Sequence, residues 1–386
     1  MYLREITLND HVWKDAARRE YHIDVGEDFD GAEINQNIRS FYIQILMQYG
    51  PGLLKIWQRS NFEHYGGLAK LVYHQRALYL VLLDPPPFPH IKECLQPQIM
   101  CQVYLGSTGQ IVTNGCDSLV KSIFKFTISK DKLALDCMTV RNRRRTYFPP
   151  FVKRFGLKRF LFEEEEEIKD RYNDYMNYMI KGLQEYSPIP LNHLLYHSTF
   201  SFCPLTPGFF KGTHSINGIE IIEVSYCGWL CFARKITGDP NIPFGKRTFS
   251  VHIKSVIHFP EEAQSSIFPM REYMKTSQDT DIGVLSSMVP SLSPFQLPVE
   301  CDCDASLDDP VFETYIWQIK AHCQVAETGF TNPTMMDALL IIFSDDIFGL
   351  LQFDMAALQL YSRVKENLEG THFTDLFPTK QPSDFI

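Results

Sequence analysis

Two short stretches in the middle of the chain carry most of the information about its fold: PGFFKGT at residues 207–213 and KITGDPNIPFG at residues 235–245. Both are rich in glycine and proline, which is typical of tight turns. The residues between them follow the pattern of β-strands. The second stretch also places three side chains that form hydrogen bonds in turns, Thr237, Asp239 and Asn241, close together. We therefore expect two turns that bracket a pair of strands.

Many other runs of β-forming residues, separated by turn residues, lie on both sides of this segment. They span residues 68–73, 78–83, 99–105, 123–128, 133–140, 218–226, 229–236, 248–256, 338–343, 349–353 and 358–361. So many short strands predict a mainly β protein of the α+β class. The expected architecture is an antiparallel β-barrel-like domain, because closing a sheet hides its edges.

Helices are expected at three places. Near the N-terminus, Asn9 or Asp10 can cap a helix in which Trp13, Ala17 and Tyr21 share one face. A second N-terminal helix is predicted over residues 33–49, and one long inserted helix over residues 160–186. The composition of residues 261–298 is typical of a weakly ordered linker, and we expect residues 378–386 to fray.

Composition limits the class of protein. The 386 residues are 45% hydrophobic, enough to bury a large core, and their formal net charge of -9 argues against a nucleic-acid or anionic-membrane binder. No apolar run is long enough to cross a membrane. The ten cysteines do not form a secreted disulfide framework, and the N-terminus has no signal-peptide pattern. We expect a soluble intracellular protein.

The sequence contains none of the common catalytic motifs, such as a phosphate-binding loop, HExxH or GxSxG. We therefore expect a protein that is not an enzyme. Cys301 with Cys303, and Cys227 with Cys231, come closest to a metal motif, but neither pair has a second half. We expect no metal and no other cofactor.

Polar and aromatic residues of the two opening stretches are the candidates for binding. The polar side chains offer hydrogen bonds for a peptide end, and the phenylalanines can line an apolar pocket. A purely structural turn, in which Asp239 binds only its own backbone, fits the sequence equally well. The candidate residues are Lys211, Thr213, Thr237, Asp239, Asn241, Phe209, Phe210 and Phe244.

Several unlinked motifs stand in a distinctive order along the chain: HYGGL at 64–68, GFFKGT at 208–213, KITGDPNIP at 235–243, TGFTNP at 328–333, IFSDDIFG at 342–349 and LQLYSRV at 358–364. These motifs, in this order, resemble those of the F-box only protein 31 family. The resemblance covers most of the chain. It implies a substrate receptor of a cullin-RING ubiquitin ligase, in which an F-box docks on the Skp adaptor. A β-barrel-like domain then receives substrates, D-type cyclins among them, through C-terminal degrons that include amidated ends.

The resemblance also implies a domain organisation and a cytoplasmic and nuclear location. Residues 1–50 would be a helical remnant of the F-box, residues 51–364 the substrate-binding domain with a flexible insertion near 261–310, and residues 365–386 a tail. Only the last F-box helix is matched, so adaptor contact is expected through Val12, Trp13 and Ala17 of a truncated F-box.

The family's zinc site, which uses two cysteines and two histidines, has counterparts here only in Cys116 and Cys137. This again predicts no metal.

Two other classes of function fit a barrel with these motifs. The plastid Executer proteins carry similar motifs and are singlet-oxygen signalling modules, but this N-terminus lacks the character of a transit peptide. A lipocalin-type barrel would hold a small apolar molecule in an aromatic-lined cavity.

Overall fold

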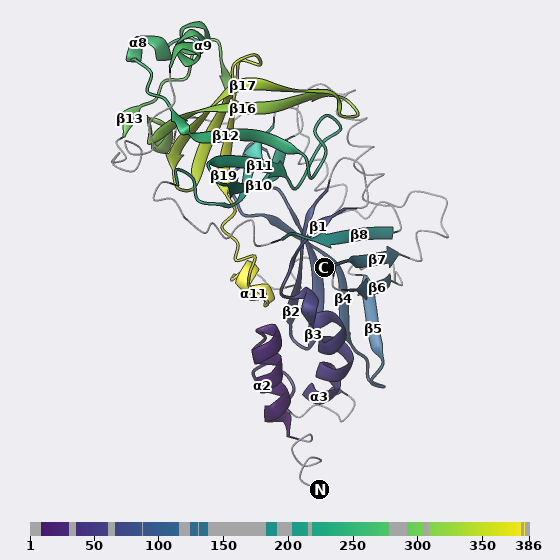
Figure 1. Cartoon of the computed structure of the whole chain (residues 1–386). Helices are drawn as coiled ribbons and strands as arrows, with labels where there is room; N and C mark the ends of the chain where they lie inside the picture. Colours follow the sequence, from purple (N-terminus) through teal and green to yellow (C-terminus); the bar gives the residue numbers. More distant parts are fainter. Residues whose placement is uncertain are drawn as a thin grey trace.

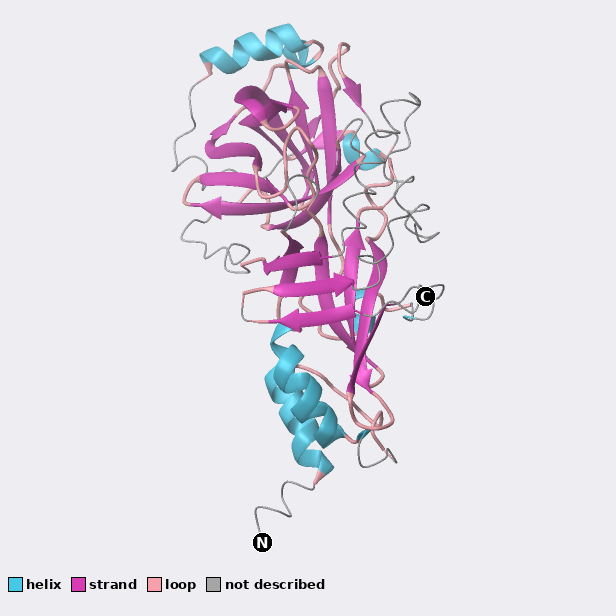
Figure 2. Ribbon diagram, turned by 90° about the vertical axis from the view of Figure 1, so that its right-hand side faces the viewer, coloured by secondary structure: helices cyan, strands magenta, loops and turns pink. Residues whose placement is uncertain are grey.

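The computed structural model describes residues 9–30, 36–60, 66–86, 88–115, 124–129, 131–137, 183–190, 203–214, 218–277, 292–303, 307, 309–379 and 382. Two large sheets lie one after the other along an elongated molecule, and helices lie at both of its ends (Figures 1 and 2). None of the described helices is long and apolar enough to cross a lipid bilayer.

The second half of the chain forms a closed antiparallel barrel, which confirms the predicted architecture. Its strands, in order around the barrel, are β9 (Gly208–Thr213), β10 (Ile219–Cys227), β11 (Leu230–Lys235), β12 (Arg247–Val256), β16 (Trp317–Glu327), β17 (Thr331–Ser344), β18 (Ile347–Gln352) and β19 (Ala357–Arg363). Strand β19 pairs with β9, with Tyr361 opposite Gly212, and this pairing closes the barrel. A short strand, β14 (Asp302–Cys303), extends the sheet beside β19 in parallel.

Side chains fill the interior of the barrel. Because side chains alternate along a strand, Phe210, Phe249 and Tyr361 point inward and belong to one buried cluster. The Phe348 ring stacks on Tyr361 with centroids 4.7 Å apart. An aromatic interior packed in this way argues against the lipocalin-type alternative, which needs an open cavity.

The segment 207–213, predicted as a turn, is strand β9 instead. Its two glycines suggested a turn, but Gly212 serves a packing need: a Cβ there would overlap the ring of Tyr361 on the neighbouring strand. Phe209 and Phe210 then point to opposite faces of the barrel wall. The sequence prediction of a turn was therefore wrong, because a partner about 150 residues away decides the conformation.

The first half of the chain builds a separate eight-stranded antiparallel sheet rather than further barrel strands. Its order is β5 (Ile111–Gly115), β4 (Gln96–Leu105), β3 (Ala77–Asp84), β2 (Leu68–His74), β1 (Ile56–Arg59), β8 (Leu183–Pro188), β7 (Leu133–Cys137) and β6 (Phe124–Ile128). The strand positions were largely predicted, but their division between two sheets was not.

The two sheets pack against each other through an apolar cluster that contains Leu68 and Val72 from the first sheet and Phe209 and Ile221 from the outer wall of the barrel. Backbone groups also meet: Gly67 N donates to Ile236 O at 3.2 Å. The first sheet therefore holds the segment that follows β11.

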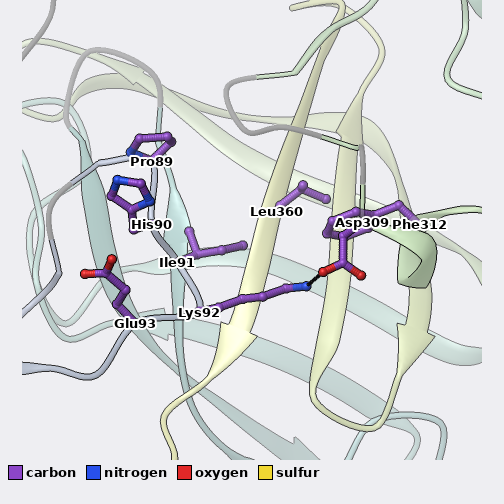
Figure 3. A pocket seen from close by; sticks show the side chains of 8 residues that line it. All are labelled: Pro89, His90, Ile91, Lys92, Glu93, Asp309, Phe312 and Leu360. Carbon is purple, nitrogen blue, oxygen red and sulfur yellow. Dashed lines mark hydrogen bonds and ion pairs between the residues drawn. The ribbon is translucent and has the colours of Figure 1, made fainter.

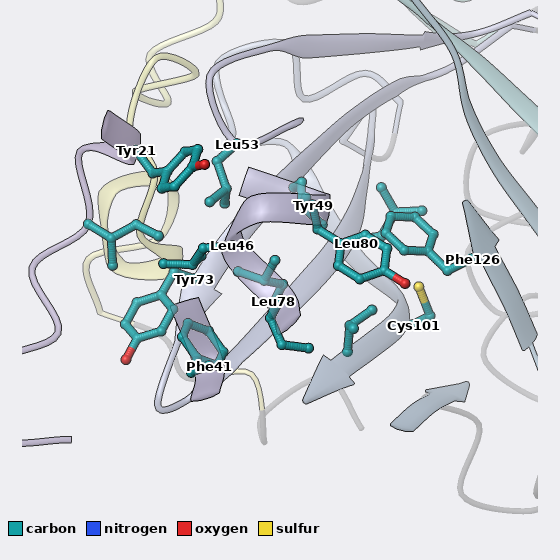
Figure 4. Close-up of a cluster of buried hydrophobic side chains, with 14 of the residues drawn as sticks. Tyr21, Phe41, Leu46, Tyr49, Leu53, Tyr73, Leu78, Leu80, Cys101 and Phe126 are labelled. Atoms are coloured by element: carbon teal, nitrogen blue, oxygen red, sulfur yellow. The ribbon is translucent and has the colours of Figure 1, made fainter. Parts of the chain in front are cut away.

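The N-terminal helix α2 (Asp10–Tyr21) is confirmed, and the Asn9 side chain caps it by accepting a hydrogen bond from His11 N at 2.9 Å. A second helical segment runs through α3 (Ile38–Phe41), the π-helical turn η2 (Tyr42–Leu46), α4 (Met47–Tyr49) and the 3-10 turn η3 (Gly50–Gly52). These helices cover one face of the first sheet, where Phe41 and Tyr49 pack near Tyr73 and Phe126 (Figure 4).

Part of the expected linker is helical. Residues 261–276 form α8 (Glu261–Gln264) and α9 (Ile267–Thr276), because Met270 and Met274 pack into the apolar cluster that also contains Phe259. Residues 278–291 lie outside the described part of the chain. The remaining short elements are β13 (Ser293–Pro294), η6 (Pro310–Phe312) and β15 (Thr314–Tyr315).

Two further predictions concern the long helix and the tail. Residues 160–182 of the expected helix lie outside the described residues, and residues 183–186, which were predicted to end it, belong to strand β8 instead. The tail includes α11 (Phe373–Leu376), and Phe373 and Phe377 are buried against the first sheet. The part of the tail up to Phe377 is thus packed on the body of the protein.

Candidate functional site

Strands β10 and β11 place two charged side chains inside one end of the barrel. Glu220 lies on the same face of β10 as Ile222, and Lys235 on the same face of β11 as Ala233, and both apolar residues belong to the barrel core. Residues 236–246, which we call the Asp239 loop, follow directly and fold over this end. Charged residues at inward positions are unusual and require partners.

Four side chains form what we call the barrel-end cluster: His214, Glu220, Lys235 and Asp239. The Lys235 Nζ lies 2.6 Å from Glu220 Oε2, 2.5 Å from Asp239 Oδ2 and 3.3 Å from His214 Nε2. Glu220, Lys235 and Asp239 are all buried. With a neutral histidine, two carboxylates face one ammonium group, so the cluster carries one negative charge in excess.

Electrostatics inside the cluster shift two pKa values. Burial alone would lower the pKa of Lys235, but the charges of Glu220 and Asp239 outweigh burial and raise it. Burial alone would raise the pKa of Asp239, but the charge of Lys235, together with that of His214 when it is protonated, outweighs burial and holds that pKa well below its usual value. Lys235 and Asp239 therefore stay charged at neutral pH.

The Asp239 loop is held by its own hydrogen bonds. Asp239 Oδ1 accepts from Asn241 N at 2.6 Å and from Ile242 N at 2.9 Å, and Thr237 Oγ1 accepts from Ile221 N at 2.7 Å. Thr237 and Asp239 are each 2% exposed. The loop is therefore buried at these two residues, because an aspartate next to a buried lysine is drawn into the ion pair.

The hairpin tip between β16 and β17 packs against this loop. Gly329 N donates to Pro240 O at 2.8 Å, and Thr328 Oγ1 lies 3.2 Å from Asn241 Oδ1. Lys246 lies over the Phe330 ring, 4.8 Å from its centroid. His214, Asn241 and Phe244 remain partly exposed, so they are the accessible part of this end of the barrel.

The candidate binding residues do not come together in one place. Thr237, Asp239 and Asn241 share the Asp239 loop, but Lys211 points to the outer face of the barrel wall, where its Nζ donates to Glu93 O. Burial lowers the pKa of Lys211.

The outer face also holds the remaining polar candidate, Thr213, whose Oγ1 accepts from Leu360 N at 3.2 Å. Phe209 and Phe210 lie on opposite faces of β9 and cannot line one pocket, while Phe244 is partly exposed. Two cavities within the described part of the chain, one beside Ile91 and Phe312 and the other beside Phe29 and Arg76, are lined by none of these eight residues. A direct binding role for the eight residues stays a prediction.

Sequence reasoning missed His214, Glu220 and Lys235. The only local signal is a charged residue in phase with apolar residues of the same strand, as Glu220 is with Ile222. The register of β10 and β11, in which Ile222 lies opposite Lys235, brings these side chains together.

Among the described residues, the ligand atoms of His214, Glu220 and Asp239 lie within 4.8 Å of one another, which is close enough to suggest a metal site. The Lys235 ammonium group already pairs with both carboxylates, however. A cation bound there would have to displace it, so the geometry fits an ion-pair cluster better than a metal centre.

The three predicted adaptor contacts lie on α2. Val12 is 40% exposed, whereas Trp13 packs on the ring of Tyr42 with centroids 5.2 Å apart and Ala17 is fully buried. Val12 is therefore the best placed of the three for direct contact with a partner, and Ala17 holds the helix in place.

Comparison with known proteins agrees with the architecture. Residues 192–367, which include all eight strands of the barrel and the Asp239 loop, match the family model of the Cyclin D1 binding domain. F-box only protein 31-A of Xenopus laevis is 24% identical to this chain over an alignment of 433 positions, gaps included, that covers 97% of the chain and 80% of that protein. The resemblance to F-box only protein 31 is confirmed.

Two mammalian F-box only protein 31 sequences agree with this result. The protein of Mus musculus is 24% identical over 95% of this chain and 80% of its own length, and that of Homo sapiens is 24% identical over 94% and 77%. The similarity to F-box only protein 31 therefore extends beyond the barrel to the first sheet and the N-terminal helices.

Proposed function

We propose that this chain is a substrate-recognition subunit of an SCF-type ubiquitin ligase. It binds proteins with C-terminal degrons, cyclins for example, and presents them for ubiquitination and proteasomal degradation. The similarity to F-box only protein 31 and the cyclin D1 binding domain match over the barrel support this function. The Skp adaptor and a cullin would be its partners in the cytoplasm and nucleus, and the chain itself would not catalyse the transfer of ubiquitin.

The barrel-end cluster is the observation that carries the proposal. A ligand that contacts the partly exposed His214, Asn241 and Phe244 lies close to two buried carboxylates and only one lysine. Thr237 and Asp239 would act from beneath by fixing the loop, because the structure engages Thr237 Oγ1 and both Asp239 carboxylate oxygens in hydrogen bonds within the chain. Asp239 would also act through its negative charge.

This electrostatic environment favours one kind of chain end. A terminal carboxylate about 6 Å from the excess negative charge would be repelled by about 3 kcal/mol at an effective dielectric constant of about 20. A terminal carboxamide has no charge and offers N–H donors to the carboxylates. We therefore expect amidated ends to bind better than free carboxylates at this site.

Peptide binding measured by fluorescence anisotropy tests the proposal. Two peptides that differ only in an amide or a carboxylate at the C-terminus should differ in affinity by at least tenfold, with the amide the tighter. Asn241→Ala should weaken binding of the amide, whereas Asn114→Ala, an exposed asparagine on the first sheet, should not. Equal affinity of the two peptides, or absence of binding by both, would contradict the proposal.

Adaptor binding is tested separately by co-purification with the Skp adaptor. Val12→Arg should reduce the amount of adaptor recovered, because it places a charge on an exposed apolar position of α2. His11→Arg changes an exposed neighbour and serves as the control. Recovery that is the same for the wild type and Val12→Arg would argue against this contact.

A further inference from the structure

A cavity of about 320 Å³ lies outside the barrel, and we call it the wall cleft (Figure 3). Three distant parts of the chain build it: the connection between β3 and β4, the turn η6, and the outer face of β19. Its volume is at the lower end of the range of ligand pockets. None of the binding or adaptor residues discussed above lines it.

The floor of the wall cleft is apolar. Ile91 from the β3–β4 connection, Phe312 from η6 and Leu360 from β19 line it, and all three belong to one buried cluster. An apolar floor gains free energy when it is covered by an apolar group, by about 25 cal/mol for each Å² removed from water. A large aliphatic or aromatic side chain is the group that this floor accommodates.

The rim of the wall cleft is polar but electrically balanced. Lys92 forms an ion pair with Asp309 across the opening, and Lys92 also lies 5.4 Å from the centroid of the Phe312 ring (Figure 3). The Lys92 and Asp309 side chains are 44% and 45% exposed, so their ion pair contributes little to stability. Both side chains can therefore turn toward a ligand. Ammonium and carboxylate together match the C=O and N–H of a peptide group.

Strand β9 connects the wall cleft to the barrel-end cluster. Lys211 on this strand donates to the carbonyl of Glu93, which lines the wall cleft, and His214, three residues later, belongs to the cluster. Three residues of a strand span about 10 Å. An extended peptide of three to five residues can therefore reach from one site to the other.

We propose that the wall cleft binds a large apolar side chain of the substrate, three to five residues before its C-terminus. This inference rests on the proposed function, since it takes the chain end to lie at the Asp239 loop. The substrate would then be recognised at two points, by its terminal group and by an upstream apolar residue whose backbone contacts Lys92 and Asp309.

A peptide scan with the full-length chain tests this inference. The probes are decapeptides of glycine and serine that end in an amide and carry one leucine, placed in turn at each of the last seven positions. Affinity measured by anisotropy should be at least tenfold higher with the leucine three to five residues from the end than at the other positions.

Ile91→Trp, which fills the wall cleft, should abolish this positional preference, and Lys92→Met should weaken it. Ile111→Trp, at a partly exposed position on strand β5 of the first sheet, is the control for an added indole ring. Circular dichroism establishes whether each variant is folded, and Lys92→Met provides the test if Ile91→Trp is not.

The outcomes separate the two proposals. If amidated peptides bind but the position of leucine has no effect, the wall cleft is not the upstream site, although the proposed function stands. If no peptide binds, both proposals fail. Native mass spectrometry could instead detect a small apolar molecule or a second copy of the chain bound to the wild type. If that binding is lost in Ile91→Trp, the wall cleft does not have a peptide-binding role.

Discussion

Replacing Lys235 by methionine should destabilise the protein more than replacing either of its acidic partners. The substitution leaves Glu220 and Asp239 buried without their shared cation. Removal of one partner from a buried ion pair typically costs about 3–5 kcal/mol of unfolding free energy. Repulsion between two carboxylates about 5 Å apart, at an effective dielectric constant of about 20, gives a similar figure of about 3 kcal/mol.

The acidic partners provide matched controls. Glu220→Gln leaves a balanced pair of Lys235 and Asp239, so we expect a loss of about 1 kcal/mol or less. Asp239→Asn also leaves one balanced pair, that of Lys235 and Glu220. However, asparagine has only one acceptor oxygen, which cannot both accept the two backbone hydrogen bonds and accept one from the Lys235 ammonium group. We therefore expect an intermediate loss of about 2 kcal/mol.

The contribution of the barrel-end cluster to the free energy of unfolding should change with pH in opposite directions in Lys235→Met and in the wild type. In the wild type the folded pKa of Asp239 lies below its unfolded value, so its stabilisation is present above about pH 4 and is lost on acidification. In the variant, burial and mutual repulsion raise the folded carboxyl pKa values above the unfolded ones. Its stability deficit should therefore shrink as the pH falls from 7 to 5.

Urea denaturation followed by circular dichroism measures these differences, with pH 7 and pH 5 compared for each variant. The reasoning is refuted if Lys235→Met and Glu220→Gln differ by less than about 1 kcal/mol at pH 7, since the excess charge would then not decide the stability of this end of the barrel.

Two further predictions concern the framework. Burial lowers the pKa of Lys70 from 10.5 to about 8, and the Lys70 Nζ donates to Leu53 O at 2.6 Å. Between about pH 8 and pH 10.5 the native state therefore binds fewer protons than the unfolded state, so the free energy of unfolding should rise with pH by up to about 3 kcal/mol. Thermal melting measured across this pH range should show the rise in the wild type and not in Lys70→Met. Gly212→Ala should lower the free energy of unfolding by more than about 2 kcal/mol, because the new Cβ overlaps the Tyr361 ring. Gly245→Ala, which has open space around the new Cβ but a φ of +77°, should lower it by only about 1–2 kcal/mol. Equal melting temperatures of the two variants would contradict the packing role of Gly212.

Local signals were enough to predict many of the elements. The β2–β3 hairpin lies within a residue of its expected limits, and Asn9 caps α2 as expected. Turn residues and helix caps act over a few residues, so the sequence contains their cause directly. The motifs that resemble the F-box only protein 31 family were equally visible in the sequence.

Contacts between distant segments decided what the sequence alone did not. The length of β9 depends on Tyr361, and the separation of the strands into two sheets depends on which strands pair. The α9 helix gains its stability where Met270 and Met274 pack against other segments, and so does not follow from its own composition.

The sequence by itself determined a mainly β chain, most of its strands, its N-terminal helix and the resemblance to a family. Only the tertiary structure decided that Asp239 is buried, and that Lys235, Glu220 and His214 surround it. The physical reason is that strand-forming tendency is a local property, whereas the burial and pairing of a charge depend on the register of strands that meet only after the barrel has closed.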